Sequence, residues 1–480
     1  GAAQMILPEK DRKKIIMLAD DIRMHSGVAG MAREIVMGTA HKYNWFNVGA
    51  AVNHPEVGKV LDISADVNKQ LDLTDSWVRV MPANGYGDPM LLRNVIKAEK
   101  PDALFIFTDP RYWVWLFDIE REIRTKIPIF WYNIWDDYPA PLYNVNYYDS
   151  VDTLMSISKQ TRNINELVLG ERAKSKVLKF IPHGINTKFF YPVEEEKQLK
   201  QLGDFKKDLY KGKDIDFTVF FNSRNIHRKH PGDTILAFRH FCDKIGKEKA
   251  KKCALIMHTA VVDQNGTDLR AVKEALCDPD YVNVYFSSDR LTPEQMNLLY
   301  NVADVNVLMS SNEGWGLSLT EAMVTGTMII PNVTGGMQDQ CRFENDKGEW
   351  IDFNEDFPSN HRGTYKKCGD WAVPVFPSNI SLAGSPPTPY IFDDRADVND
   401  VADAIETVYN LGPEERKKRG LKGREWALSE EAGFTAQAMA NRVGDTMEEG
   451  FKKFKPRPKF EIIKVDKAPN KYVKHKLSNY

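Results

Sequence analysis

Short runs of apolar residues alternate along the first part of the chain with stretches in which apolar residues recur every three or four positions. The short runs predict buried strands, and the periodic stretches predict helices. The expected strands cover residues 15–19, 47–52, 78–81, 103–108, 127–132, 151–157 and 177–181, and the expected helices cover 28–40, 89–98, 112–124 and 159–169. Repeated strand–helix units of this length predict an α/β fold with a doubly wound parallel sheet.

The alternating pattern stops near residue 194 and then restarts. Residues 194–214 are rich in Glu, Lys and Asp and have few apolar positions, which is typical of a linker or an exposed helix. Beyond them, strands are expected at 217–221, 254–257, 282–286, 305–309 and 328–330, with helices at 233–241, 293–301 and 317–324. We therefore expect two Rossmann-like domains, residues 5–185 and 216–430, joined by a linker at 186–215. Ligands of such sheets bind beyond the carboxyl ends of the strands, here in a cleft that the two domains would face.

The pattern is less regular after residue 340. From 341 to 395 it gives way to Pro, Gly, Ser and aromatic residues, and a loop of this length is usually functional or mobile. Helical spacing returns at 398–410, 413–428 and 431–451. The lysine-rich stretch 455–480 is interpreted as a solvated tail, with a binding arm as the alternative.

Composition narrows the classes of protein to consider. A chain of 480 residues is long enough for two domains, or three. Its formal charge of -2 gives no argument for binding nucleic acid or an anionic membrane. Five scattered cysteines without a Cys-x-x-Cys pair indicate reduced thiols and no zinc site. No apolar run approaches the roughly 18 residues of a spanning helix, and no signal peptide is recognised, so we expect a cytoplasmic protein without a transmembrane segment.

The stretch from Ser310 to Met323 joins a predicted strand to a predicted helix and contains two glutamates, Glu313 in the loop and Glu321 in the helix. Its two glycines, Gly314 and Gly316, let a ligand approach the backbone closely. The helix start that follows presents N–H groups that have no partner within the helix, which favours an anion. The stretch therefore indicates a phosphate-binding loop.

Two basic residues, Arg224 and Lys229, follow the first strand of the second domain, at the same edge as the loop with Glu313. Charge-assisted hydrogen bonds contribute roughly 1.5–3 kcal/mol each, whereas a helix dipole contributes about 0.3–1 kcal/mol. We therefore expect the two cations to dominate the binding of a diphosphate, with a solvated basic turn as the alternative. Glu321 is placed to accept hydrogen bonds from diol hydroxyls such as those of a ribose, with an ordinary helix glutamate as its alternative.

The first predicted strand leads into a loop that holds Ser26, Gly27 and Gly30. The Gly-x-x-Gly spacing differs from the dinucleotide fingerprint Gly-x-Gly-x-x-Gly, so a phosphate loop and a tight strand-to-helix turn both remain open.

The motif Ser-x-x-Glu-Gly-Trp-Gly-Leu-x-x-x-Glu-Ala-Met, with Arg224, Lys229 and Pro182-His183-Gly184-Ile185-Asn186, resembles the retaining nucleotide-sugar glycosyltransferases of the GT-B fold (glycosyl transferases group 1, glycosyltransferase family 4-like). The resemblance is most specific from about residue 181 to 331 and is weaker over the N-terminal domain. It implies two Rossmann-like domains around a cleft, with the nucleotide sugar on the C-terminal domain and the acceptor on the N-terminal side. It also implies a final helix, about 431–451, that crosses back onto the N-terminal domain.

The resemblance also implies roles for particular residues. Arg224 and Lys229 would hold the diphosphate and, with Glu313, would be the catalytic residues, while Glu321 would bind the ribose. Glu313 would also lie at the donor sugar. The other donor-binding residues, at the sugar and the phosphates, would be Gly314, Trp315, Gly316, Leu317, Ser26 and Gly27.

The family needs no metal, and no cofactor is expected beside the nucleotide-diphosphate sugar, which is the donor substrate. Asp214-Ile-Asp216 and Asp278-Pro-Asp280 superficially match the metal-binding Asp-x-Asp of the other glycosyltransferase fold. Neither stands at the carboxyl end of a predicted strand, so we predict no metal site.

One stretch departs from the family pattern. Members commonly carry a histidine after the strand equivalent to 127–132, close to the reacting sugar, and this chain has Asn133, Trp135 or Asp136 as its replacement. The loop from 135 to 148 is also rich in aromatic residues, which are either core residues or a stacking platform for a sugar or a base. We take Trp135, Asp136 and Asp137 as the candidate acceptor-binding residues.

The expected function is metal-independent, retaining transfer of a hexose or related sugar from a nucleotide-diphosphate sugar to an acceptor hydroxyl. A UDP-sugar or a GDP-sugar, and a carbohydrate or another acceptor, are left open. The alternatives are a sugar phosphorylase, a nucleotide-sugar epimerase, a member that only binds nucleotide or glycan, and a DNA-glucosylating transferase. The near-neutral charge does not favour nucleic acid as a partner, although the basic tail would serve it.

Overall fold

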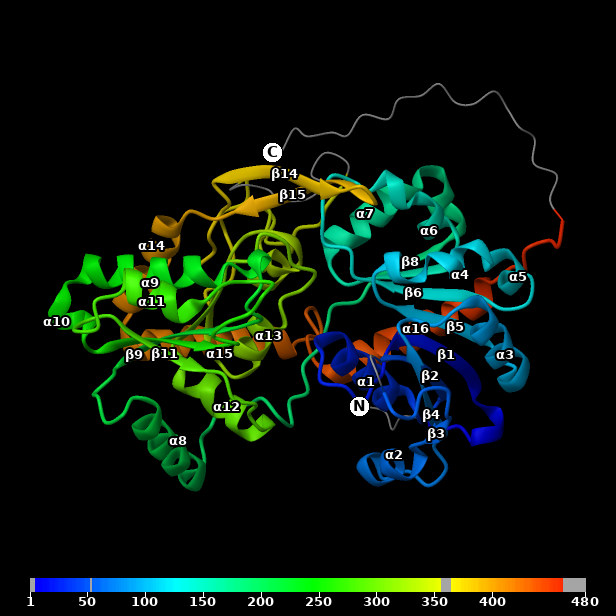
Figure 1. The fold of residues 1–480 in the computed structure, drawn as a ribbon, viewed down its shortest axis with the longest axis horizontal. Coiled ribbons are helices and arrows are strands. Elements are labelled where there is room, and N and C mark those ends of the chain that lie inside the picture. The colour runs from blue at the N-terminus through cyan, green and yellow to red at the C-terminus, as the bar shows by residue number, and fades with distance from the viewer. Residues whose placement is uncertain (1–4, 52–53, 355–363, 461–480) are drawn as a thin grey trace. The chain divides into compact units, whose positions relative to one another are not determined.

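The structure is a computed structural model that describes residues 5–51, 54–354 and 364–460. The chain divides into two compact units (Figure 1). The first unit holds the described residues up to Trp135, residues Pro139–Gly184, and residues 436–460. The second unit holds Ile185–Thr435 and, in addition, the short segment Asp136–Tyr138.

The first unit is built on an eight-stranded sheet with the strand order β3-β4-β2-β1-β5-β6-β7-β8. All neighbouring strands pair in parallel except β3 and β4. Beyond β4 the chain returns to the other side of β1 to form β5, so the strand order reverses between β1 and β5. The strands are β1 Lys13–Asp20, β2 Tyr43–Ala51, β3 Leu61–Asp62, β4 Val78–Asn84, β5 Ala103–Phe107, β6 Ile129–Asn133, β7 Thr153–Ser156 and β8 Val177–Phe180.

Helices connect these strands, and one helix comes from the far end of the sequence. The helix α16 (Ala436–Lys453) packs against α1 (Gly27–Thr39) and lies beside it in the first unit. It starts later than the expected residue 431 because Ser429 accepts the N–H of Gly433 in a turn that closes the preceding helix. The other helices of this unit are α2 Ser64–Leu71, α3 Pro89–Glu99, α4 Val114–Asp118, α5 Glu120–Arg124, α6 Val145–Asp149 and α7 Lys159–Leu169.

The single helix expected at 112–124 is wrong in detail. The chain forms a 3-10 turn at Pro110–Trp113, followed by the two short helices α4 and α5. Ile119 separates them with φ -111° and ψ 11°, outside the helical region. The 3-10 turn begins where the carboxylate of Asp109 accepts the N–H of Arg111, which fixes the start of this segment.

The second unit is built on a five-stranded parallel sheet with the order β11-β10-β9-β12-β13. The chain runs outward from β9 to β11 and then crosses to the other side of β9 to form β12. Figure 1 accordingly shows α9 on one side of this sheet and α12 on the other. The strands are β9 Phe217–Asn222, β10 Cys253–His258, β11 Asn283–Ser287, β12 Val305–Leu308 and β13 Met328–Pro331.

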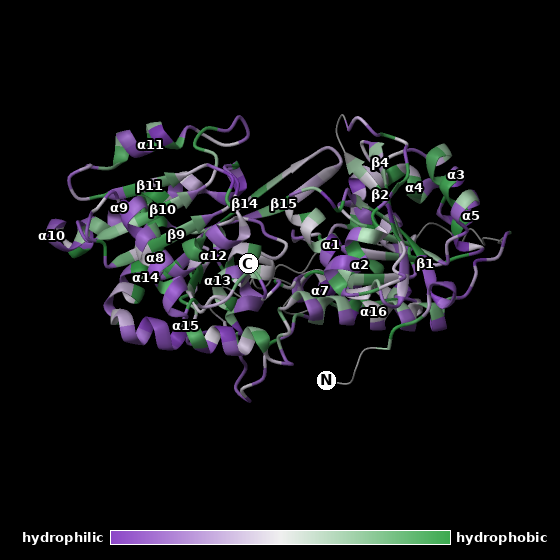
Figure 2. Ribbon diagram, turned by 90° about the horizontal axis from the view of Figure 1, so that it is seen from below, coloured by the Kyte–Doolittle hydropathy of each residue, from purple (hydrophilic) through white to green (hydrophobic). Residues whose placement is uncertain are grey.

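The helices of the second unit follow the expected spacing closely. The charged stretch that precedes the sheet is a helix, α8 (Glu196–Leu209), which buries none of its residues. The other helices are α9 Pro231–Ile245, α10 Lys247–Ala250, α11 Leu269–Leu276, α12 Pro293–Val302, α13 Leu317–Val324, α14 Val398–Asn410 and α15 Gly412–Leu428. In Figure 2, β1, β9 and β10 are mainly apolar, whereas the outer helices carry polar faces. The strands therefore form the cores of the two units.

The stretch 341–395, expected to be a long loop, contains a β-hairpin. Strand β14 (Asn379–Ser385) pairs antiparallel with β15 (Thr388–Arg395), and the two form a sheet of their own. The two prolines between Ser385 and Thr388 make its turn rather than ending the structure. Residues 355–363 of this stretch, and residues 461–480 of the basic tail, lie outside the described residues.

Among the helices of the described chain, none is long and apolar enough to cross a membrane.

Candidate active site

The candidate site lies where the strand order of the second unit reverses, between β9 and β12. At such a point the loops after the two neighbouring strands diverge to opposite faces, which leaves room for a ligand at their carboxyl ends. The loop after β9 carries Arg224 and Lys229, and the loop after β12, residues 310–316, carries Glu313. We call the second one the Glu313 loop.

Two glycines after β13 hold the Glu313 loop in place. The N–H of Gly336 donates to the carbonyl of Glu313 at 3.1 Å. A Cβ on Gly335 would lie 1.9 Å from that carbonyl oxygen, and a Cβ on Gly336 would lie 2.2 Å from the carbonyl oxygen of Gly314. Only glycine therefore permits this close packing of two backbones.

Glu313 and Lys229 form a buried ion pair. The ammonium of Lys229 donates to Oε2 of Glu313, which also accepts from the hydroxyl of Ser310 at 3.0 Å. Burial alone would raise the pKa of Glu313, but the charges of Lys229 and Arg228 outweigh burial, so its pKa lies below the usual value. Burial lowers the pKa of Lys229, and Glu313 opposes that shift. The two predicted residues are thus together, as a charged pair.

Arg228 approaches this pair, whereas Arg224 does not. The guanidinium of Arg228 lies 3.7 Å from Oε1 of Glu313 and donates to the carbonyl of Asn312 at 2.9 Å. The side chain of Arg224 is exposed and makes no ion pair within the part of the chain that the structure describes. Sequence reasoning missed Arg228, although the basic run 227–230 was visible, because the place after the strand and the family resemblance pointed to Arg224 and Lys229.

Glu321 faces a buried tyrosine. Burial raises the pKa of Glu321 to about 7, and a hydrogen bond with Tyr300 works against that rise. The hydroxyl of Tyr300 also accepts from the amide of Asn222, at the end of β9, at 2.8 Å. Tyr300 and Asn222 therefore connect Glu321 to the β9 end of the site. Neither was predicted, since only the folded chain brings α12, α13 and β9 together.

The residues Gly314 to Leu317 lead into α13. Gly316 has φ +91°, which suits glycine, and the helix begins at Leu317. The ring of Trp315 is 2% exposed, and its N–H donates to Thr320 at 2.8 Å. Trp315 therefore packs in the core of the second unit, and only its backbone is available to a ligand.

Ser26 and Gly27 stand at the start of α1 in the first unit. The hydroxyl of Ser26 accepts the N–H of Ala29 at 3.0 Å and donates to the carboxylate of Asp20 at 2.9 Å. This is an N-cap of the kind that favours serine at a helix start. The strand order of the first unit reverses between β1 and β5, so this helix start also stands at a point where ligands bind in open sheets.

The three candidate acceptor residues belong to different units of the structure. Trp135 belongs to the first unit, where its ring is 6% exposed and packs edge-on against Tyr143. Asp136 and Asp137 belong to the second unit, where Oδ1 of Asp137 accepts from the amide of Asn312. Burial raises the pKa of both aspartates; Arg228 opposes the rise for Asp136, and Asp136 adds to it for Asp137. The two carboxyl groups are hydrogen-bonded to each other, which favours a proton shared between them.

Asn133 was one of the three candidates to replace the histidine that members of the family commonly carry. Its side chain is fully buried. Its amide donates to the side chain of Asn165 at 2.8 Å, and Asn165 in turn donates to the hydroxyl of Ser156 at 2.8 Å. Asn133 thus serves the polar interior of the first unit.

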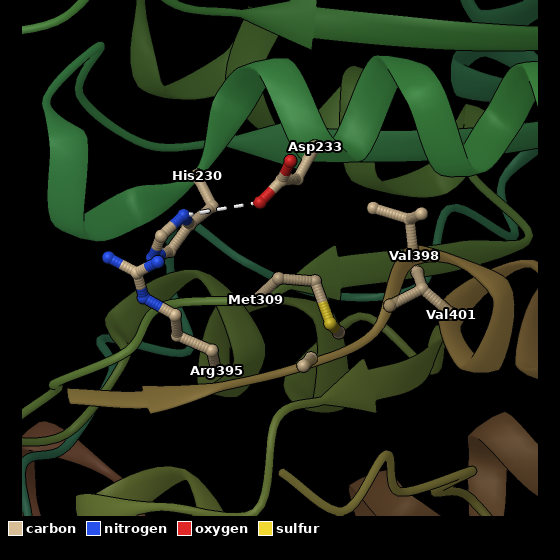
Figure 3. Close-up of a pocket in the computed structure, with 7 residues that line it drawn as sticks. His230, Asp233, Met309, Arg395, Val398 and Val401 are labelled. Carbon is tan, nitrogen blue, oxygen red and sulfur yellow. Dashed lines mark ion pairs between the residues drawn. The ribbon is translucent and has the colours of Figure 1, made fainter. Parts of the chain in front are cut away.

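A small pocket adjoins the site (Figure 3). It contains His230, which follows Lys229, and Met309, which precedes the Glu313 loop. His230 lies 3.3 Å from the carboxylate of Asp233, and Arg395 extends toward the ring of His230. The other lining residues are Ala396, Val398 and Val401. Within the described residues, no three His, Cys, Asp or Glu side chains are grouped so as to hold a metal ion.

Part of the chain is similar to a known protein family. Residues 211–357 match the family model described as glycosyl transferases group 1. That range contains β9 to β13 and every second-unit residue of the site described above except Asp136 and Asp137. No curated protein sequence matches the chain.

Solved structures match over nearly the whole chain. A glycosyltransferase from Rickettsia africae ESF-5 has 14% identity and a TM-score of 0.60, covering 92% of this chain and 99% of its own. Anabaena HepE, solved with UDP and glucose, has 12% identity and a TM-score of 0.60, covering 91% and 100%. Sucrose-phosphate synthase from Thermosynechococcus elongatus has 16% identity and a TM-score of 0.60, covering 92% and 100%. The fold is GT-B, as the resemblance implied, and within it residues 211–357 are similar to the group 1 glycosyltransferases.

Proposed function

We propose that the protein transfers a sugar, with retention of configuration and without a metal, from a nucleotide-diphosphate sugar to an acceptor hydroxyl. The observation that carries the proposal is the grouping of Lys229, Glu313 and Glu321 at the reversal between β9 and β12. A UDP-sugar is the first donor to test, because HepE, which shares the fold, was solved with UDP and glucose.

The ion pair suggests how a donor would bind. Lys229 is a buried cation at the candidate site, and its charge is engaged by Glu313. A diphosphate would compete with Glu313 for Lys229, and the carboxylate released in this way would be free to face the sugar. Lys229 and the N–H groups at the start of α13 would then stabilise the departing diphosphate from fixed positions, which is the most effective form of electrostatic catalysis.

The remaining residues complete the proposal. Glu321, held by Tyr300, would accept hydrogen bonds from the ribose hydroxyls. Arg224 and the backbone of Gly314 to Leu317 would add to the phosphate and sugar contacts. Asp136 and Asp137, close to Arg228 and Lys229, would receive the acceptor hydroxyls. Ser26 and Gly27 would complete the phosphate site from the first unit. The five free cysteines are compatible with a cytoplasmic location.

The first experiment is a thermal-shift screen with UDP- and GDP-sugars, followed by a transfer assay. A donor at 100 times its Kd stabilises the native state by about 2.7 kcal/mol, which raises the melting temperature. An epimerase would convert the nucleotide sugar without an acceptor, and a phosphorylase would consume phosphate without a nucleotide. A member that only binds would shift the melting temperature without hydrolysing or transferring the sugar.

The second experiment separates catalysis from stability. Lys229→Met should reduce transfer by about 10²–10³-fold and should also destabilise the fold, because Glu313 loses its closest counter-charge. The double variant Lys229→Met/Glu313→Gln also removes the buried carboxylate that has lost its closest counter-charge, so the melting temperature should recover while transfer stays low. Wild-type turnover by Lys229→Met at low donor concentration would refute the site assignment.

A further inference from the structure

The β14–β15 hairpin does not pair with either of the two larger sheets. It forms a separate two-stranded sheet, and most of its residues are exposed or half-buried. An isolated hairpin is only marginally stable in water. Contacts with the rest of the second unit must therefore hold the hairpin in position. Those described below involve Phe392 and Asp394, near the carboxyl end of β15.

Asp394 makes the first set of contacts. Its N–H donates to the carbonyl of Ser311 at 3.1 Å, and its carbonyl accepts from the amide of Asn332 at 2.9 Å. Its buried carboxylate accepts from the hydroxyl of Thr334 at 2.6 Å. The same amide of Asn332 also donates to the carbonyl of Ser310 at 2.9 Å. The hairpin is thus fastened to the loops after β12 and β13, which include the Glu313 loop.

Asn312 makes the second set. Its side-chain amide donates to the carbonyl of Phe392, in β15, at 2.7 Å and also to the carboxylate of Asp137. Its side-chain oxygen accepts from the hydroxyl of Ser311 at 3.0 Å. Asn312 is itself buried, so these contacts occur away from water, where a lost partner is costly. The hairpin and the segment 136–138 are therefore both held by one side chain.

The backbone of Asn312 carries this restraint toward the chemistry. Its carbonyl accepts from Arg228 at 2.9 Å, through the same nitrogen that lies 3.7 Å from Glu313. The carbonyl of Arg228 accepts the N–H of Ser311 at 2.9 Å, which closes a ring between the two loops. The guanidinium of Arg228 therefore points at Glu313 only while the backbone of Asn312 stays in place.

We propose that the hairpin is a positioning element of the active site, and that Asn312 is the positioning residue through which it aligns Arg228 with Glu313. This inference rests on the proposed function of Glu313 in transfer. In the variant Asn312→Ser, which keeps a small polar group but loses the amide, Arg228 should drift from Glu313. The variant should lower kcat by about 10–100-fold and change the donor KM by less than threefold, because Lys229 and Glu321 still bind the donor.

Two further variants make the test specific. Thr334→Val loosens the hairpin from its other anchor and should lower kcat in the same way. If both anchors act on one loop, the double variant Asn312→Ser/Thr334→Val should lose less than the product of the two single losses. Leu382→Ser, on the exposed surface of the hairpin, is the control and should keep wild-type kcat. Additive losses, or equal losses in kcat and donor affinity, would overturn the proposal.

A readout without turnover distinguishes this inference from the proposed function. Arg228 contributes to the low pKa of Glu313, so Asn312→Ser should raise that pKa. The carboxyl resonance of Glu313 can be followed by ¹³C NMR of labelled glutamate and assigned by its loss in Glu313→Gln. An unchanged titration in Asn312→Ser would overturn the positioning role. Absence of transfer by the wild-type protein would instead overturn the proposed function, and the titration would still decide on Asn312.

Discussion

Glu313 and Glu321 have the same side chain but opposite electrostatic surroundings. Two cations hold the pKa of Glu313 below its usual value despite its burial. For Glu321, burial raises the pKa to about 7, and the hydrogen bond with the hydroxyl of Tyr300 offsets only part of that rise. At neutral pH Glu313 is therefore ionised, whereas Glu321 is close to half protonated. The two glutamates would respond to pH in different ranges.

This difference predicts a pH dependence of donor binding. A protonated Glu321 accepts ribose hydroxyls poorly, so the affinity for UDP-glucose should rise as pH increases toward 7 and level off above it. Between pH 6 and pH 7.5 we expect a gain of up to about tenfold, since one pKa unit corresponds to a tenfold change. Calorimetric titration from pH 5.5 to 8.5 measures it, and UDP-glucose avoids the titration of a terminal phosphate.

Glu321→Gln is the matched control for this prediction, because the amide cannot titrate. Its affinity for UDP-glucose should be lower than that of the wild type above pH 7 and should vary little with pH. If Glu321→Gln kept the wild-type slope, the titrating group would lie elsewhere, and the aspartates Asp136 and Asp137 would be the next candidates.

Single residues also mark the limit of prediction from sequence. Glu313, Glu321 and Lys229 could be named as candidates because glycine spacing and strand ends restrict where a phosphate loop can stand. Arg228 and Tyr300 could not, since their roles depend on which elements become neighbours. Arg228 gains its partner from the loop after β12, more than 80 residues further along the chain.

At the level of elements, local signals decided what could be predicted. The expected bounds of α7, α13 and α14 agree with the structure because apolar spacing and end signals coincide there. The β14–β15 hairpin was missed because its prolines and Gly384 are typical of loops. In the structure the prolines form the turn, and Gly384 lies at a shift in strand register. Its anchors are tertiary, so no local pattern marks them.

The contact between α1 and α16 gives a prediction on stability. A Cβ on Gly38 in α1 would lie 2.3 Å from the Cβ of Ala440 in α16. In an open helix, glycine to alanine would stabilise the fold by about 1 kcal/mol. Here the clash should reverse the sign, so Gly38→Ala should lower the free energy of unfolding by about 1–3 kcal/mol. Urea unfolding followed by circular dichroism measures the change.

A compensating variant tests the cause. Ala440→Gly alone should destabilise by about 1 kcal/mol through helix propensity. The double variant Gly38→Ala/Ala440→Gly exchanges the two residues across the contact and should return close to wild-type stability. A double variant no more stable than Gly38→Ala would show that the two helices do not approach each other at this point.

On the scale of the whole molecule, the alternating pattern was sufficient for the fold class, because repeated strand–helix units that build mainly parallel sheets leave few topologies. It could not reveal that Asp136–Tyr138 joins the second unit while its flanking residues belong to the first. That assignment depends on Asn312 and Phe392, which contact the segment from distant parts of the sequence. The formal charge of -2 does not favour duplex DNA as the acceptor.

Hydrogen exchange on the intact protein can test whether both units take part in donor binding. Saturating UDP-glucose should slow exchange in peptides covering 222–230 and 310–321 of the second unit. If Ser26 and Gly27 complete the phosphate site, a peptide covering 24–31 should also slow, because the first N–H groups of α1 have no partner within the helix. Residues Lys247–Ala250 precede β10, at the amino ends of the strands and away from the candidate site. Their exchange rate should be the same with and without UDP-glucose. Protection confined to the second unit would exclude Ser26 and Gly27 from the donor site and leave the roles of Lys229 and Glu321 intact.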